Sequence, residues 1–189
     1  NVSLAEKIIP AADVSEQISL ASKEASGTSN MKLMLNGAIT IATLDGANVE
    51  IRDAVGDENI YIFGLTEAEV YAYYENKNYS SREVYETNPI VHRVLNAFVD
   101  GSIPNIEREG QEIVDSLLLY NDEYFLLRDF DAYCKAQARL NQDYQDATHW
   151  QKCSLINIAN AGTFSADKTV KQYAEDIWQI EPLFAHKGR

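Results

Sequence analysis

Apolar and polar residues follow two different periods along the chain. Up to about residue 64, short apolar runs rich in β-branched residues alternate with runs at helical spacing, separated by glycine, proline or small polar residues. The predicted elements are a helix at 2–9 capped by Ser3 and ended by Pro10, a strand or extended loop at 11–18, a helix at 30–36 stopped by Gly37, a strand at 38–44, an Asp45-Gly46 turn, a helix at 47–55 and a strand at 60–63. This alternation predicts a βαβ arrangement with parallel strands and helices on both faces of the sheet.

Beyond residue 64 the chain shows mainly helical spacing. Thr66 and Glu69 have the spacing of a capping box at a helix start, and apolar residues recur every three or four positions in several later segments. The predicted helices lie at 66–74, 91–98, 113–118, 131–140 and 170–178, the last with Ser165 as its N-cap and Glu181-Pro182 as its end. We therefore predict an α/β fold, with a βαβ portion at 1–64 and a mostly helical remainder of the same domain at 65–189.

The charge of the chain argues against some classes of partner. The 189 residues include 16 Lys and Arg against 29 Asp and Glu, which gives a formal net charge of −13. Nucleic acids and anionic membrane surfaces need a basic footprint, so we expect neither as a partner. The excess is uneven, because residues 1–56 carry seven acids and four bases, whereas the rest carries twenty-two acids and twelve bases. The least acidic part is therefore the part that best suits an anion site.

Cysteine usage and the lack of long apolar runs indicate a cytoplasmic protein. Cys134 and Cys153 are too few and too far apart for a disulfide scaffold, and we expect both to be free, buried thiols. No run of about 20 apolar residues could span a membrane, and the N-terminus has no signal-peptide pattern. The chain begins at Asn1 rather than at a methionine, and we interpret it as an internal piece of a longer protein.

A cluster of tyrosines follows the predicted capping box, at Tyr71, Tyr73, Tyr74 and Tyr79. Aromatic surfaces stack on sugars, but such clusters on an amphipathic helix more often serve packing and the rim of a core. Packing is therefore the preferred interpretation.

The segment 24–32, EASGTSNMK, carries the strongest chemical signal. Small residues at 25–29 let the backbone approach a ligand closely, and the first amides of a helix lack intrahelical partners, so a phosphate suits this helix start. Lys32 follows Thr28 by four positions and lies on the same helix face. An amine beside a phosphate suits a phosphate-bearing aldehyde held as a Schiff base, as pyridoxal phosphate is. The spacing alone also fits, and favours, an ordinary capped helix with an exposed lysine; the GxGxxG and P-loop motifs are absent.

At these residues the sequence resembles the α-glucan phosphorylases, the family of glycogen, starch and maltodextrin phosphorylases. The pyridoxal-phosphate signature of that family reads E-A-S-G-T-G-N-M-K, against EASGTSNMK here. The similarity extends through VSLAEKIIPAADVSEQIS before the segment and NGAITIATLDGANVEI after it. Weaker similarity continues at 58–64 and 157–178, so the resemblance covers nearly the whole chain.

The resemblance implies a set of cofactor residues. Lys32 matches the lysine that forms the Schiff base with pyridoxal 5′-phosphate. Thr28 and the amide of Ser29 match positions that hold the 5′-phosphate, together with the amide of Gly27. Ser29 replaces the usual glycine of the family, and it would be strained if its φ were positive. Asn1 stands where animal members have an arginine near the cofactor phosphate, so the resemblance does not imply that contact here.

The resemblance also implies substrate contacts. Glu24, Ser26 and Gly27 match positions that contact the glucosyl unit at the cleavage point, and Lys32 and Glu24 are the catalytic candidates. Glu16 with Glu24 matches a spaced glutamate pair of related retaining glycosyltransferases. No metal site is expected.

The reaction that the resemblance implies is phosphorolysis, a hexosyl transfer of glycogen and carbohydrate metabolism. An α-1,4-glucan and orthophosphate give glucose 1-phosphate and a shortened glucan, with retention. The phosphate of the cofactor, rather than its aldehyde, serves as proton donor or electrostatic partner, so two phosphates must be neutralised side by side.

The resemblance covers only the last quarter of the family enzyme. It implies part of a Rossmann-like C-terminal domain of the GT-B type, followed by helices, with a missing N-terminal domain of the same chain as the opposite wall of the cleft. The full-length enzyme is expected to be a homodimer, and this piece is expected to be inactive alone. Two other functions remain open here. One is a stand-alone, non-catalytic module that binds glucan or protein, and the other is a pyridoxal-phosphate enzyme that uses the aldehyde in amine chemistry.

Overall fold

The computed structural model describes residues 1–181, except for the side chain of Glu107. Its sheet has three parallel strands, β1 (Val14–Gln17), β2 (Ile39–Ala42) and β3 (Tyr61–Ile62), in that spatial order. Val14 is paired with Ile39, and Ile41 with Tyr61. The predicted α/β class and the parallel sheet are therefore confirmed, and the uncertain segment 11–18 contains a strand.

Helices make up most of the remaining chain. The α-helices are α1 (Val2–Ile8), α2 (Ser29–Leu35), α3 (Asn48–Val55), α4 (Glu67–Asn76), α5 (Ser81–Thr87), α6 (Pro89–Ala97), α7 (Glu107–Val114), α8 (Leu126–Tyr144), α9 (Ala147–Asn160) and α10 (Ala166–Gln172). Short 3-10 turns are η1 (Ile9–Ala11), η2 (Asp57–Asn59) and η4 (Ala161–Phe164), and π-helical turns are η3 (Asp115–Leu119) and η5 (Tyr173–Trp178).

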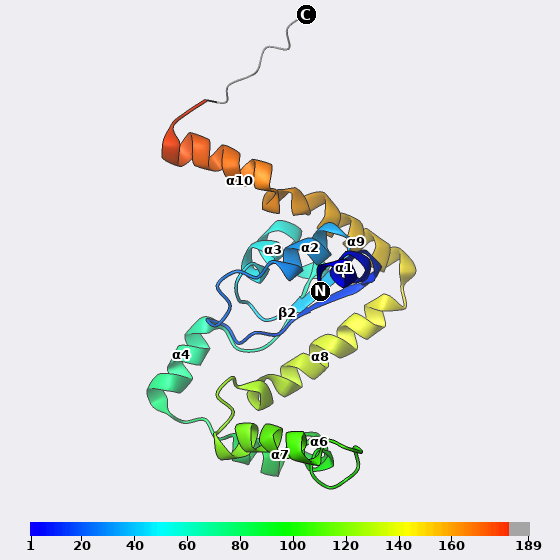
Figure 1. The fold of residues 1–189 in the computed structure, drawn as a ribbon, viewed down its shortest axis with the longest axis vertical. Helices are drawn as coiled ribbons and strands as arrows, with labels where there is room; N and C mark the ends of the chain where they lie inside the picture. Colours follow the sequence, from blue (N-terminus) through cyan, green and yellow to red (C-terminus); the bar gives the residue numbers. More distant parts are fainter. Residues whose placement is uncertain (182–189) are drawn as a thin grey trace, which may run out of the picture.

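Helices cover both faces of the sheet, as the alternation of elements predicts (Figure 1). On one face, Ile39 and Ile41 pack with residues of α8 and the first half of α9. On the other face, Met34 of α2 and Ile51 of α3 pack with residues that include Ile62 of β3. Successive residues of a strand point to opposite faces, and both faces are covered here, so all four residues of β2 are buried, including the polar Thr40.

The first helix begins and ends differently from the prediction. The N-cap of α1 is Asn1, whose side-chain Oδ1 accepts the Leu4 N–H at 2.9 Å, so the prediction of Ser3 is wrong by two residues. Pro10 does not end the helical path at once. It occupies an early position of η1, where a missing N–H leaves no helical bond unmade.

Two helices were not predicted, and a third is longer than predicted. In α9 the buried positions are Trp150, Cys153 and Asn157, and the polar Asn157 interrupts the apolar stripe on which a prediction depends. The short helix α5 has only Ser81 buried, so it has no apolar stripe at all. The segment 131–140 forms only the middle of α8, because the carboxylate of Asp122 accepts the Leu126 and Leu127 N–H groups and starts that helix earlier.

The two cysteines differ in burial, and two of the clustered tyrosines pack against the core. Both cysteines are free, but only Cys153 is buried; Cys134 is exposed on α8, which corrects the prediction of two buried thiols. Tyr73 and Tyr79 pack against the buried ring of Phe125, with ring centroids 5.4 and 4.8 Å away. The packing interpretation is therefore confirmed for these two tyrosines.

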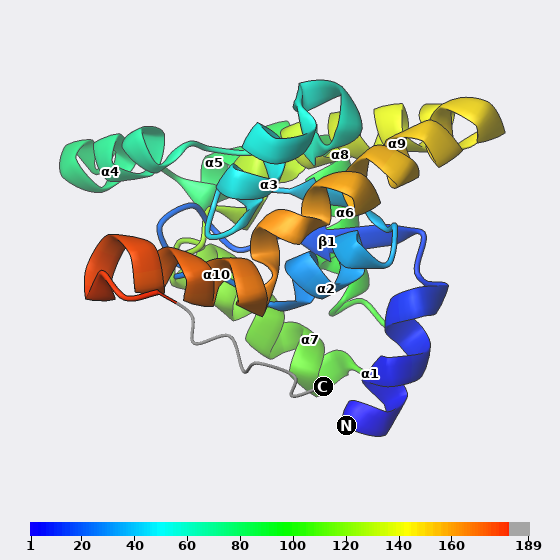
Figure 2. The ribbon, with the colours of Figure 1, turned by 90° about the horizontal axis from the view of Figure 1, so that it is seen from above.

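The last predicted helix forms, but its apolar stripe is exposed. Ser165 is the N-cap, accepting the Lys168 N–H at 3.2 Å. Val170 and Tyr173 are 56% and 46% exposed, and Ile177 and Trp178 are 65% and 54% exposed. Figure 2 shows α1 and α10 near the outer edges of the molecule, on either side of α2. The predicted stop at Pro182 lies outside the described residues.

The division of the chain into residues 1–64 and 65–189 stays a prediction. In the part of the chain that the structure describes, no helix has both the length and the apolar composition needed to cross a membrane.

Candidate functional site

The predicted site residues lie at the carboxyl ends of the strands. The connection between β1 and α2 carries Glu24, Ser26, Gly27 and Thr28, and the turn between β2 and α3 lies beside it. Ligands of open parallel α/β sheets bind at this edge. The structure therefore brings the EASGTSNMK residues together where such a fold offers a binding site.

The start of α2 presents unpaired backbone donors. Gly27 has φ +80°, a left-handed conformation that favours glycine, and Thr28 is the N-cap without a side-chain capping bond. Among residues 1–181, the N–H groups of Thr28, Ser29 and Asn30 donate no hydrogen bond. These amides, at the positive end of a helix, are free to bind an anion.

Ser29 fits this helix start without strain. It is the first residue of α2, and its φ is not positive. Its hydroxyl donates to Oε1 of Gln17 on β1, at 3.3 Å. The serine in place of the family's glycine therefore has no left-handed strain, and its side chain adds a contact between α2 and β1.

Lys32 lies on the outward face of α2. The buried residues of this helix are Asn30 and Met34, and Lys32 is exposed. Its N–H donates to the carbonyl of Thr28 at 3.2 Å, so the two residues lie one helical turn apart. Within the described residues, no carboxylate lies within 4.0 Å of its ammonium group. The amine is therefore available to a ligand at the start of the helix.

Glu24 borders a hollow next to the same loop. Its carboxylate accepts only a long bond, 3.5 Å, from the Ser26 N–H. The hollow has a volume of about 510 Å³ and is also lined by Asp45, Glu50 of α3 and Glu67 of α4. Glu24 is thus exposed and able to reach a ligand outside the chain.

Glu16 has a different setting from Glu24. It lies on β1 and is turned toward α8, where its carboxylate accepts hydrogen bonds from the hydroxyl of Tyr133 and, at 3.3 Å, from Nε2 of Gln137. Glu24, by contrast, lines the hollow beside α3. The structure does not bring these two glutamates into contact, and the contacts of Glu16 join the sheet to α8.

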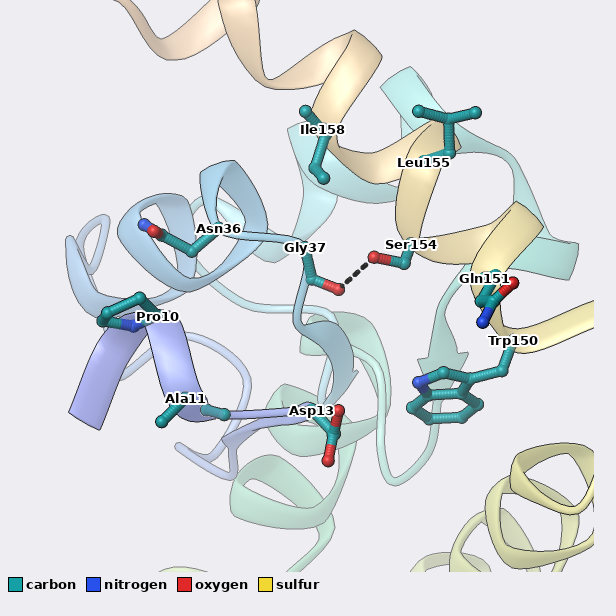
Figure 3. A pocket seen from close by; sticks show the side chains of 11 residues that line it. Pro10, Ala11, Asp13, Asn36, Gly37, Trp150, Gln151, Ser154, Leu155 and Ile158 are labelled. Atoms are coloured by element: carbon teal, nitrogen blue, oxygen red, sulfur yellow. Dashed lines mark hydrogen bonds between the residues drawn. The ribbon is translucent and has the colours of Figure 1, made fainter. Parts of the chain in front are cut away.

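A second hollow, of about 400 Å³, lies at the opposite end of the strands (Figure 3). Asp13 precedes β1 and Gly37 precedes β2, and the hydroxyl of Ser154 donates to the carbonyl of Gly37 at 2.7 Å. Trp150 of α9 forms part of its wall. None of the sequence-predicted site residues lines this hollow, so it is separate from the candidate site.

Sequence reasoning missed Asp45. It was assigned only to a turn, yet its carboxylate is buried under the candidate loop and accepts hydrogen bonds from the backbone of residues 22–24. The available signal was its position, since a carboxylate shortly after a buried parallel strand lies at the ligand-binding edge of the sheet.

The chain is thus an α/β protein, with a candidate anion site and an exposed lysine at the carboxyl edge of its parallel sheet. The chain matches the family model of carbohydrate phosphorylases over residues 1–180 and belongs to this family. It is 52% identical over 182 residues to the glycogen phosphorylase of Bacillus subtilis (strain 168), a match that covers 96% of this chain and 23% of the relative.

Mammalian relatives match over the same part of the chain. The brain form of glycogen phosphorylase from Mus musculus is 44% identical over 181 residues, and the liver form from Homo sapiens is 44% identical over 185 residues. Each match covers 96% of this chain and 21% of the relative. The chain thus spans less than a quarter of the length of these relatives, and the family resemblance of the sequence is confirmed.

Proposed function

We propose that this chain supplies the cofactor-binding and glucosyl-binding part of an α-glucan phosphorylase, a glycosyltransferase that depends on pyridoxal 5′-phosphate. The reaction is the transfer of a glucosyl unit from an α-1,4-glucan to orthophosphate, with retention, to give glucose 1-phosphate. One observation carries the proposal: unpaired amides at the start of α2 and an unpaired lysine one helical turn further on lie within the segment EASGTSNMK.

The residues at the start of α2 fit the cofactor. A phosphate group needs several donors, and the N–H groups of Thr28, Ser29 and Asn30 lack acceptors within the described chain. A Cβ at Gly27 would lie 3.3 Å from the side chain of Asn30 and would add strain at φ +80°, so glycine keeps this approach open. Lys32 would hold the cofactor through its amine. When bound, the cofactor supplies a phosphate that acts as proton donor or electrostatic partner to the substrate phosphate.

The residues of this chain have three tasks in the proposed reaction. The amides of residues 28–30 and the helix dipole stabilise negative charge where two phosphates meet. Glu24, Ser26 and Gly27 hold the glucosyl unit. Lys32 keeps the cofactor in place, so its removal abolishes binding rather than one chemical step.

The rest of the cleft would come from a longer polypeptide. We infer a Rossmann-like, GT-B type C-terminal domain in a cytoplasmic homodimer, whose N-terminal domain forms the opposite wall. Val2, Leu4 and Ile8 of α1 are 75%, 53% and 53% exposed, and the stripe of α10 and η5 is similarly open. Apolar surface of this extent suits burial against further protein. The isolated chain is therefore expected to be inactive.

A hybrid protein tests the proposal, with these 189 residues in place of the matching segment of the Bacillus subtilis relative. Borohydride reduction with pyridoxal phosphate should attach the cofactor to Lys32, as located by peptide mass mapping. No label, or a label confined to other lysines, would contradict the proposal. Phosphorolysis should survive the reduction because the aldehyde is not used. Loss of activity on reduction would instead favour amine chemistry.

A further inference from the structure

The carboxylate of Asp45 is buried directly beneath the candidate loop. The residue is 7% exposed and follows β2 after a short connection. Its Oδ1 accepts the Ser22 N–H at 3.0 Å, and its Oδ2 accepts the N–H groups of Lys23 at 3.2 Å and Glu24 at 2.7 Å. Three consecutive amides therefore converge on one charged side chain, which satisfies the buried charge and fixes the path of the loop.

The residues after Asp45 hold the far side of the same loop. The N–H of Ala47 donates to the carbonyl of Ser26 at 2.7 Å. A Cβ at Gly46 would lie 2.4 Å from that carbonyl oxygen, so the turn and the loop touch so closely that only glycine fits. Hydrogen bonds therefore hold the loop on both sides of Glu24, to Asp45 through residues 22–24 and to Ala47 through Ser26.

Ser22 shows that the loop is held under strain. Its φ is +82°, which a residue with a side chain rarely adopts. Strained residues persist where the surroundings over-determine them, and they concentrate at functional sites. The bond from its N–H to Asp45 is one such constraint.

The same turn also reaches α2. Nδ2 of Asn48 donates to the carbonyl of Thr43 at 3.2 Å, and Nδ2 of Asn30 donates to Oδ1 of Asn48 at 2.9 Å. Asn30 and Asn48 are 2% and 4% exposed, so this link is shielded from water. Asn30 precedes Lys32 by two residues in α2. One turn therefore connects the loop of Glu24 with the helix of Lys32.

We propose that Asp45 is a positioning residue for the glucosyl-binding loop. Its carboxylate oxygens accept the N–H groups of residues 22–24, and through these bonds it fixes Glu24 and Ser26 relative to Lys32. The inference rests on the proposed function above. A small displacement of reacting groups lowers the rate of an enzyme strongly, so the loss of this anchor changes catalysis more than folding.

An amide cannot replace the carboxylate here. The two oxygens of Asp45 face three N–H donors, whereas asparagine has one oxygen and an NH₂ group. In either orientation, the NH₂ group of an asparagine would therefore face at least one of the N–H groups of residues 22–24, and that hydrogen bond would be lost. Asp45→Asn keeps the size of the side chain and removes the anchor, and Asp57→Asn is a matched control because the Asp57 side chain is 87% exposed.

The experiment measures phosphorolysis kinetics in the hybrid protein, with rates normalised to bound cofactor so that only folded sites are counted. We expect Asp45→Asn to lower kcat/KM for the α-1,4-glucan by roughly 10- to 100-fold, with a raised KM as well as a lowered kcat. Cofactor content should be retained, and Asp57→Asn should behave as the unchanged hybrid. If Asp45→Asn alone fails to fold, the double variant Ser22→Gly with Asp45→Asn is measured instead. Glycine at position 22 relieves the backbone strain there and so offsets the stability lost with the Asp45 hydrogen bonds.

Two results would overturn the inference. One is unchanged kcat and KM in Asp45→Asn. The other is a loss of cofactor content with normal KM and normal rates per bound cofactor, which marks a purely structural role. An unsubstituted hybrid that neither binds cofactor nor releases glucose 1-phosphate overturns the proposed function instead, and this inference with it.

Discussion

Ser22 and Ser29 show how the backbone decides the effect of a single side chain. Both are serines in or next to the same loop, but Ser22 has a left-handed backbone and Ser29 a helical one. The side chain of Ser22 therefore adds strain, whereas that of Ser29 adds a hydrogen bond to Gln17. The same substitution by glycine must act in opposite directions at the two positions.

We predict that Ser22→Gly stabilises the chain by about 1 kcal/mol, because it relieves the left-handed strain. Ser29→Gly should destabilise it by about 0.5–1.5 kcal/mol, through the lost hydrogen bond and the flexibility of glycine in a helix. Urea unfolding of the two variants and the unchanged chain measures both effects. A gain of stability in Ser29→Gly would contradict the helical geometry at that position.

Asp129 predicts a dependence of stability on pH. Burial raises the pKa of Asp129 to about 6 from its ordinary value of 3.8, and the bond from the Leu65 N–H offsets this only in part. The folded state therefore holds the proton more tightly than the unfolded chain does. The contribution of this group to stability is full below about pH 4 and is lost as pH rises through about 6.

Asp129→Asn should remove this dependence while it keeps an acceptor for the Leu65 N–H. The free energy of unfolding of the variant, relative to the unchanged chain, should rise by about 1–3 kcal/mol between pH 4 and pH 7. Urea titrations at several pH values measure the difference. A difference that stays flat over this range would rule out the raised pKa.

The site was predictable at the residue scale only where its chemistry is local. The spacing of Thr28 and Lys32 places them on one helix face, and the resemblance to the family signature implies the role that we propose for each. Asp45 acts across 21 to 23 residues of sequence through backbone amides, which leave no pattern of side chains to read. Glu16 contacts residues of α8 that lie 117 and 121 positions away in the sequence, and these contacts could not be predicted either.

Two helix starts show how much the surroundings of an element matter. Thr66 and Glu69 form the predicted capping box of α4, and Val70 of that helix is fully buried in a core cluster. Ser165 caps α10, a helix without a buried residue. The caps are chemically alike, but only the first supports an element that is packed into the core.

We predict that Thr66→Ala lowers the global free energy of unfolding by about 1 kcal/mol. Ser165→Ala should instead increase hydrogen exchange of the α10 amides and leave global stability nearly unchanged, because α10 unfolds locally. Hydrogen exchange with mass spectrometry, together with urea unfolding, separates the two cases. A global loss in Ser165→Ala as large as that in Thr66→Ala would show that α10 is part of the cooperative core.

Elements were predictable where consecutive residues of a mainly apolar segment are buried. The runs at 38–44 and 60–63 became β2 and β3 because both faces of the sheet are covered. In α9, burial instead depends on Asn157, whose Nδ2 donates to the carbonyl of Asn59 at 2.9 Å. Because Asn157 is polar, it breaks the helical spacing of apolar residues, and the sequence therefore did not predict this helix.

At the scale of the whole molecule, the candidate site is open to solvent. Glu24, Ser26, Thr28, Ser29 and Lys32 are all exposed, and the chain spans only 21–23% of the length of its relatives. An open wall excludes little water, so it holds a charged ligand weakly. We therefore expect the isolated chain to bind pyridoxal phosphate weakly or not at all.

The absorbance spectrum of the isolated chain tests this expectation, with and without added pyridoxal phosphate. We expect no stable new band from a cofactor bound to Lys32 in the isolated chain, and a clear one in the hybrid protein. A strong band in the isolated chain that is lost in Lys32→Ala would contradict the expectation and show that this half of the cleft is already complete.

The most direct test of the proposed function is the release of glucose 1-phosphate from an α-1,4-glucan by the hybrid protein. We predict release that requires orthophosphate, falls to background in Lys32→Ala and persists in Lys135→Ala, a change at an exposed lysine of α8. Release at a normal rate by the Lys32→Ala hybrid would contradict the assignment of this chain as the cofactor-binding part of a phosphorylase.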